Sequence, residues 1–196
     1  MSDQKTVTPD AEGIAAAAKA AAKKGPPPVH LWNPPFCGDL DIRIARDGTW
    51  FYLGTPIGRK PLVKLFSSIL KLEDGKYFLV TPVEKVGIEV EDAPFVAVDF
   101  TAEGDGEQRK ITFLTNVDDT ATAGPDHPIR VELDAESGEP SPYIHIRRGL
   151  EALIDRKSFY RLVDIGETQT HEEEEWFGLR SEGTFFPVIL ASALHG

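Results

Sequence analysis

Short alternating apolar runs, separated by turn dipeptides, constrain the fold of this chain more than any other feature. Ile42 and Ile44 alternate with polar residues, Asp47-Gly48 follows them, and residues 49–53 form a second run. An Asp-Gly pair between two such runs is a strong signal for a β-hairpin, because both residues tolerate the backbone of a tight turn. We therefore expect a β-rich fold.

Further strands are expected along the rest of the chain from the spacing of apolar residues. They cover residues 76–81, 85–90, 95–101, 108–114, 129–133 and 143–146, with a closing hairpin of 176–181 and 184–190. Helical spacing instead marks residues 61–70 and residues 150–163. The second helical stripe changes phase between Ile154 and Phe159, which predicts one kinked helix or two short helices.

The order of these elements predicts an α+β fold with two β-rich halves. Each half repeats a motif of strands, a basic pair, a helix and further strands, which suggests an internal duplication. We expect an N-terminal domain with one helix over residues 29–92 and a C-terminal domain over residues 93–196. Residues 1–28 form an Ala/Pro-rich arm. Its predicted helix at residues 11–24 has no large apolar stripe, so we expect it to pack weakly.

Two pairs of adjacent cations stand where the predicted helices begin. Arg59-Lys60 follows Gly58, and Arg147-Arg148 precedes the second helical stripe. A helix start carries partial positive charge and free N–H groups, so cations are disfavoured there unless an anion binds. Both pairs therefore predict a site for a phosphate or another small anion. The alternatives are solvated loop residues for the first pair and ion pairs with the following helix for the second.

The charge and length of the apolar runs exclude some classes of function. The net charge of −11 argues against binding of long nucleic acids, whereas an excess of cations within residues 21–71 suits a small anion. No apolar run is long enough for a membrane-spanning helix, and the N-terminus has no secretion signal. Cys37 is the only cysteine, so no intramolecular disulfide can form, and we expect a cytoplasmic protein.

Polar residues between the predicted strands supply further candidates. Thr115 and Asn116 could hydrogen-bond a base or a ribose. Three carboxylates and one imidazole form a metal-like cluster in the sequence. Its members are Asp118, Asp119, Asp126 and His127. A turn-rich loop is the preferred interpretation, because no spacing here matches a known metal motif, and no metal or cofactor is assigned.

Several segments carry a resemblance to a known family. They are Cys37–Ile44, Trp50–Ile57, Leu62–Phe66, Leu79–Lys85, Asp92–Phe95, Thr115–Asp119 and Gly124–Pro128. Over residues 30–190 the chain resembles the bacterial domain of unknown function 1285 family. The resemblance implies two repeated structural motifs, with a second half similar to pleckstrin-homology-like folds. It also implies a nucleotide-like ligand between the halves and a signalling role, and it supplies no catalytic residues.

Three functional hypotheses follow. The first is a non-catalytic module that binds a small anionic, nucleotide-like ligand at the interface between the halves and signals to a protein partner. Its ligand-binding candidates are Gly58, Arg59, Lys60, Thr115, Asn116, Arg147 and Arg148. The second is a metal-dependent hydrolase of a phosphorylated substrate, and the third is a protein-interaction domain.

Overall fold

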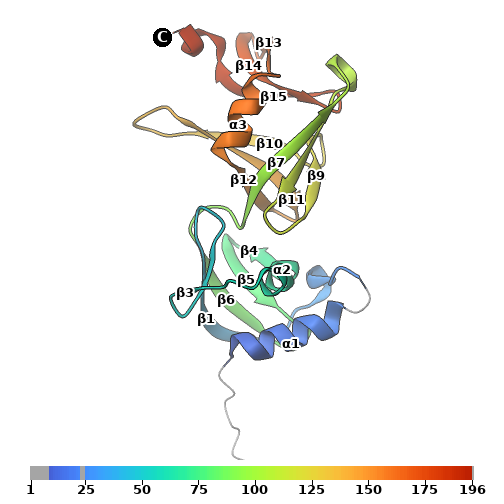
Figure 1. Cartoon of the computed structure of the whole chain (residues 1–196), viewed down its shortest axis with the longest axis vertical. Helices are drawn as coiled ribbons and strands as arrows, with labels where there is room; N and C mark the ends of the chain where they lie inside the picture. Colours follow the sequence, from blue (N-terminus) through green and yellow to red (C-terminus); the bar gives the residue numbers. More distant parts are fainter. Residues whose placement is uncertain (1–8, 23–24, 196) are drawn as a thin grey trace, which may run out of the picture. The chain divides into compact units, whose positions relative to one another are not determined.

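The computed structural model describes residues 9–22 and 25–195 and separates the chain into two compact units, Met1–Asp92 and Ala93–Gly196. Figure 1 shows both units as mostly β-structure with few helices. The expectation of two β-rich halves is confirmed, because strands far outnumber the three α-helices among the described residues. Among residues 9–22 and 25–195, none of the helices combines the length and the apolar character that a membrane span needs.

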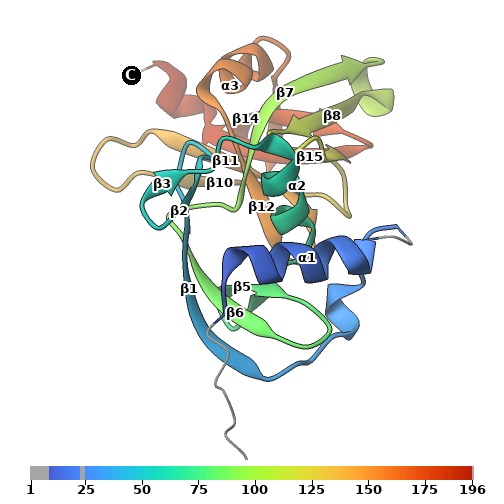
Figure 2. The same cartoon turned by 60° about the horizontal axis from the view of Figure 1, so that its bottom comes forward.

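The first unit contains a curled six-stranded sheet with helices on one face (Figures 1 and 2). Its elements are α1 (Ala11–Ala21), η2 (Val29–Leu31), β1 (Phe36–Ile44), β2 (Trp50–Tyr52), β3 (Thr55–Pro56), α2 (Lys60–Ser68), β4 (Leu70–Glu73), β5 (Lys76–Val80) and β6 (Lys85–Val90). The strand order is β3-β2-β1-β6-β5-β4, in which two three-stranded meanders meet at the parallel pair of β1 and β6. The hairpin predicted at Asp47-Gly48 joins β1 to β2.

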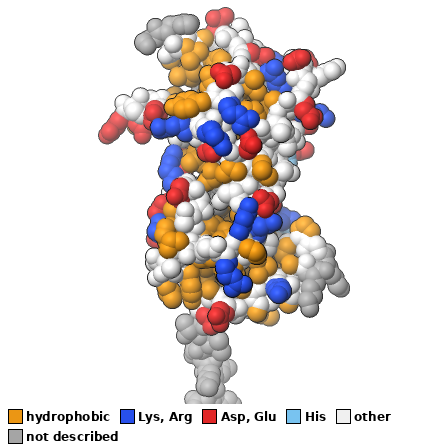
Figure 3. Space-filling model, in the orientation of Figure 1, with side chains coloured by type: hydrophobic (Ala, Val, Ile, Leu, Met, Phe, Trp, Pro, Cys, Tyr) orange, Lys and Arg blue, Asp and Glu red, His pale blue; other side chains and the backbone are white. Residues whose placement is uncertain are grey.

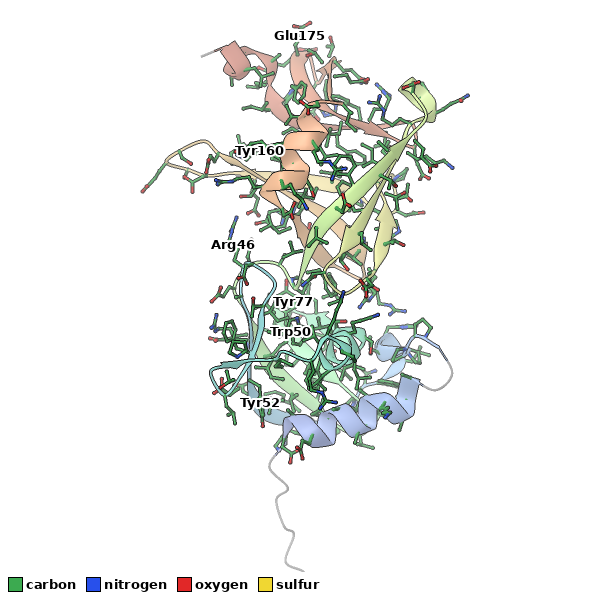
Figure 4. The ribbon with its side chains drawn as sticks, viewed as in Figure 1. Arg46, Trp50, Tyr52, Tyr77, Tyr160 and Glu175 are labelled. Atoms are coloured by element: carbon green, nitrogen blue, oxygen red, sulfur yellow. The ribbon has the colours of Figure 1, made fainter. Side chains whose placement is uncertain are left out.

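The core of the first unit lies between its sheet and α2. The ring of Trp50 stacks on the ring of Phe66 from α2, with centroids 6.2 Å apart and planes inclined by 17°. Figure 4 shows Trp50 inside this unit, beside α2. Ile42, Ile69 and Leu79 are also fully buried. The helical stripe predicted over residues 61–70 is therefore the apolar face of α2.

The N-terminal helix differs from the expected weakly packed arm. α1 packs against α2, and the side chains of Ile14 and Ala18 have no exposed surface. Alanine side chains are small, so two helices can approach closely without a stripe of large residues. Residues 1–8 and 23–24 of the predicted arm lie outside the described residues.

The second unit contains a six-stranded and a three-stranded sheet. Its elements are β7 (Phe95–Glu103), η3 (Gly106–Gln108), β8 (Lys110–Thr115), β9 (Thr120–Thr122), β10 (Ile129–Leu133), β11 (Pro140–Arg147), β12 (Leu150–Ile154), α3 (Arg156–Val163), β13 (Glu167–His171), β14 (Glu174–Ser181), β15 (Thr184–Leu190) and η4 (Ala191–His195). β14 and β15 form the predicted closing hairpin. Phe113 and Ile144 of the larger sheet and Leu179 of the smaller one are buried.

The two larger sheets have the same topology. The strand order of the second sheet is β10-β11-β12-β7-β8-β9. β7 and β12, its first and last strands in chain order, form the parallel pair at its centre. The backbone confirms the correspondence, because the Glu91 N–H donates to the Ile44 carbonyl and the Asp155 N–H donates to the Ala97 carbonyl. The repeat therefore lies in the sheets. The pleckstrin-like character of the second half stays a prediction.

The predicted repeat of helices is wrong. α2 links the third and fourth strands of its sheet, whereas α3 follows the sixth strand of the other. Leu150, Ala152 and Ile154 are buried at every second position and belong to β12, so one helix of eight residues replaces the predicted kinked helix or two short helices. A short apolar run is compatible with a helix or a strand. Residues 150–154 form a strand because they pair with β7 and β11.

Candidate anion-binding site

The start of α2 carries the first predicted basic pair. Arg59 occupies the position before the helix with an extended backbone, Lys60 is the first helical residue, and Pro61 follows. All three residues and Gly58 are exposed. Open space surrounds Gly58, since a Cβ there would meet no atom within 4 Å. The predicted helix start is thus confirmed, and a ligand has room to approach it.

The backbone of this helix start offers few hydrogen bonds to a ligand. The N–H groups of Leu62 and Val63 both donate to the Arg59 carbonyl, at 3.0 and 3.2 Å. Pro61 has no N–H. An anion at this position would therefore be held mainly by the Arg59 and Lys60 side chains, which can make charge-assisted hydrogen bonds.

The start of α2 differs from the other two α-helix starts of the described residues. Asp10 caps α1 by accepting from the Gly13 N–H, and Asp155 caps α3 by accepting from the Ser158 N–H at 2.8 Å. α2 has neither a side-chain cap nor an acidic residue in its first turn. In Figure 3, Lys and Arg side chains gather over the part of the first unit where Figure 1 places α2.

The second predicted pair does not open a helix. Arg147 ends β11, and Arg148 with Gly149 forms the tight turn to β12. The guanidinium of Arg147 pairs with the Asp119 carboxylate at 2.5 Å and lies 5.1 Å from the Phe95 ring centroid. Arg147 therefore has an internal anionic partner, which the sequence did not indicate because Asp119 precedes it by 28 residues.

Arg148 is exposed at the hairpin turn. Its φ of 46° and the φ of 80° at Gly149 are both positive, as a two-residue turn of type I′ requires. The His145 ring holds this turn, because its Nε2 accepts from the Gly149 N–H at 2.9 Å. Arg148 thus projects from a strained turn rather than from a helix start.

Thr115 and Asn116 are engaged with the backbone of their own unit. The buried Thr115 hydroxyl accepts from the N–H groups of Val117 and Asp119, at 3.3 and 3.0 Å. The Asn116 side-chain oxygen accepts from the Val96 N–H at 3.1 Å. These bonds shape the β8–β9 turn and fix the start of β7. Binding of a base or ribose by these residues stays a prediction.

The metal-like cluster of the sequence does not assemble. Asp119 pairs with Arg147, and the His127 Nδ1 donates to the His145 carbonyl at 2.9 Å. Across residues 9–22 and 25–195, no group of three or more His, Cys, Asp or Glu side chains could hold a metal ion. The hydrolase hypothesis therefore loses the cluster on which it rested.

A basic pair that the sequence did not single out stands at the start of α3. Arg156 and Lys157 are the first two residues of this helix, and both are exposed. The change of phase between Ile154 and Phe159 was the signal for this start. Unlike α2, α3 has a carboxylate cap from Asp155, which already satisfies part of the positive end of the helix.

Comparisons with known proteins agree over most of the chain. The model described as "Domain of unknown function (DUF1285), N-terminal domain" matches residues 27–93, and "Protein of unknown function (DUF1285), C-terminal domain" matches residues 94–188. The crystal structure of a DUF1285 family protein from Silicibacter pomeroyi DSS-3 is similar with a TM-score of 0.85 and 60% identity, over 94% of this chain and 98% of that chain.

A second crystal structure of a DUF1285 family protein, from Shewanella baltica OS155, has a TM-score of 0.51 and 34% identity. It covers 63% of this chain and 90% of that chain. No curated protein matches.

Proposed function

We propose that this chain, which belongs to the DUF1285 family, binds a small anionic, nucleotide-like ligand and holds it at the start of α2. The family name assigns no activity, so the proposal rests on the geometry of the chain itself. The observation that carries it is the uncapped start of α2 with the exposed cations Arg59 and Lys60. The resemblance noted in the sequence supports a nucleotide-like ligand and a signalling role.

Electrostatics favour an anion at this position. Each cation beside an exposed helix start costs about 0.3–1 kcal/mol, because it repels the positive end of the helix dipole. A bound phosphate is attracted by the positive end of the helix and accepts hydrogen bonds from both side chains, worth about 1.5–3 kcal/mol each. The two cations beside the helix start therefore stabilise a bound anion, although they are unfavourable when no anion is bound.

A shared site for both predicted basic pairs stays a prediction. The proposal needs only the first pair, since Arg147 is already paired with Asp119. We propose no catalytic residue. A module that binds a ligand and changes its interactions with a protein partner would fit the signalling role.

The test is a thermal-shift and calorimetry screen of the full chain with inorganic phosphate, mononucleotides and cyclic dinucleotides. A ligand that binds only the folded state raises the unfolding midpoint. We expect at least one nucleotide to raise it, and we expect Arg59→Ala with Lys60→Ala to weaken that nucleotide at least 100-fold, from the loss of two charge-assisted hydrogen bonds. The unfolding midpoint without ligand should stay the same or rise slightly.

The matched control removes the two cations at the start of α3 with Arg156→Ala and Lys157→Ala. This variant loses the same charge from the start of another helix, one position further into the helix, and Asp155 already caps that start. We expect it to keep nucleotide affinity within about twofold. Equal loss in both variants would show that net charge alone drives binding, and a screen without any stabilising anion would refute the proposal.

A further inference from the structure

We propose that the outer face of the first unit's sheet, opposite α2, is a docking surface for a basic segment of a partner protein. This inference is independent of the anion-binding proposal, because it concerns other residues on the other face of the sheet. Its centre is a groove between β1 and β6. The groove is lined by Asp39, Leu40, Asp41, Ile42, Gly87, Ile88 and Glu89.

The groove lies at an interruption of the parallel ladder. Asp39 is in register with Gly87, and the next register pair is Arg43 with Glu89. Over this interval β1 advances by four residues and β6 by two, so the two strands cannot stay evenly paired. The groove coincides with this interruption, because residues of β1 and β6 from the same interval line it.

Glycine at position 87 contributes to the shape of the groove. A Cβ at Gly87 would collide with the Asp39 carboxylate and would lie 3.7 Å from the Phe36 ring. The backbone φ at this glycine is not in the left-handed region, so its role is space rather than conformation. The missing side chain lets the Asp39 carboxylate lie over β6.

Three exposed carboxylates of the groove lack an ion-pair partner within the described residues. They are Asp39, Asp41 and Glu89. Two cations of the same face, Arg43 and Lys85, form ion pairs with carboxylates outside the groove. Arg43 pairs with Glu91 and lies 4.2 Å from the Phe51 ring centroid, and Lys85 pairs with Glu73 at 2.9 Å. The groove therefore presents uncompensated negative charge.

An apolar surface adjoins this charge. The Phe36 side chain begins β1 with 55% of its surface exposed, and its ring meets the Phe78 ring edge-on at 6.0 Å. Val83, in the turn before β6, is 71% exposed. Exposed aromatic and aliphatic side chains beside charged ones are typical of interaction surfaces and supply their anchor points.

The combination determines the chemistry of the partner. Negative charge repels nucleic acid and anionic lipid surfaces, whereas it attracts Lys and Arg side chains. The aromatic patch adds a contact for a neighbouring aliphatic or aromatic side chain. A peptide segment that carries Lys or Arg beside a large apolar residue is complementary to both the acidic groove and the apolar surface beside it.

The test selects random peptides displayed on phage against the full chain and measures one selected peptide by fluorescence anisotropy. We expect the selected peptides to carry Lys or Arg beside a large apolar residue. The variant Asp39→Asn, Asp41→Asn, Glu89→Gln should bind this peptide at least tenfold more weakly. Its melting curve checks that it folds.

The matched control is Glu172→Gln, Glu173→Gln, Glu174→Gln, which removes three exposed carboxylates from the second unit. It should bind within about twofold of the unchanged chain. In the unchanged chain, the selected peptide should also slow the alkylation of Cys37, which is exposed next to Phe36.

Several outcomes would overturn the proposal. These are selected peptides without basic residues, equal loss of affinity in the two triple variants, and alkylation of Cys37 at an unchanged rate. Self-association of the chain that only the groove variant abolishes would also overturn it, because the face would then belong to a second copy.

Discussion

Arg147 and Arg148 are neighbours in sequence with opposite surroundings. Arg147 is paired with Asp119 and lies over the Phe95 ring, whereas Arg148 is exposed in a turn with a positive φ. A left-handed backbone costs a residue other than glycine about 1–2 kcal/mol, and asparagine tolerates it best among the others. The two arginines therefore differ in what their replacement does to stability.

We predict that Arg148→Asn raises the free energy of unfolding by up to about 1 kcal/mol, because Asn-Gly is the preferred pair in this type of turn. The control Arg147→Asn should lower it by about 1 kcal/mol, through loss of the ion pair and the ring contact. Denaturant titrations measure both changes. A loss of stability in Arg148→Asn would contradict the geometry of the turn.

Glu73 gives the first unit a predictable response to acid. Hydrogen bonds from Lys85 and then Lys71 hold the pKa of the Glu73 carboxyl below its ordinary value of 4.5. A lowered pKa in the folded state adds stability that is complete above pH 4.5 and is lost as the pH falls through the folded-state pKa.

We predict that Glu73→Gln lowers stability at pH 7 by about 1 kcal/mol or less, as is typical of partly exposed ion pairs. At pH values low enough to protonate the Glu73 carboxyl in the folded state, the stabilities of this variant and of the unchanged chain should converge. Urea titrations from pH 7 to pH 3 test this. A constant difference across that range would show that charge at Glu73 is not the cause.

At the scale of elements, α1 shows how a helix without large side chains becomes part of a core. Ala18 is fully buried and Ala16 is exposed on the same helix. We predict that Ala18→Asp lowers the stability of the first unit by about 2 kcal/mol or more, because a carboxylate would be buried without a partner. Ala16→Asp, with the same charge, should change it by a few tenths. Thermal melts compare them, and equal effects would mean that α1 is not docked.

At the scale of the whole molecule, the chain repeats one sheet topology in two units with separate cores. We predict that Phe66→Ala, which removes a buried ring from the first unit, raises amide hydrogen exchange in β1 and β6 more than in β11 and β12. The companion change Phe113→Ala should do the reverse. Mass spectrometry of exchanged peptides tests both, and uniform acceleration along the chain would show a single cooperative unit.

The local features of this protein could be predicted from its sequence. Turn dipeptides and alternation located the hairpins at Asp47-Gly48 and Glu182-Gly183, and the apolar stripe located α2, because these signals depend on neighbouring residues. The cations Arg59 and Lys60 at the start of α2 were also visible in the sequence, since a helix start depends on local residues.

Features that depend on distant partners became visible in the folded chain alone. The parallel pairs of β1 with β6 and β7 with β12 join strands separated by whole meanders, and the acidic groove lies at the interruption in the first pair. Packing against α2 buried α1, and Asp119 neutralised Arg147. Pairing across the sheet also made a strand of Leu150–Ile154. Local pattern cannot assign such features, because their stabilising contacts come from residues far away in sequence.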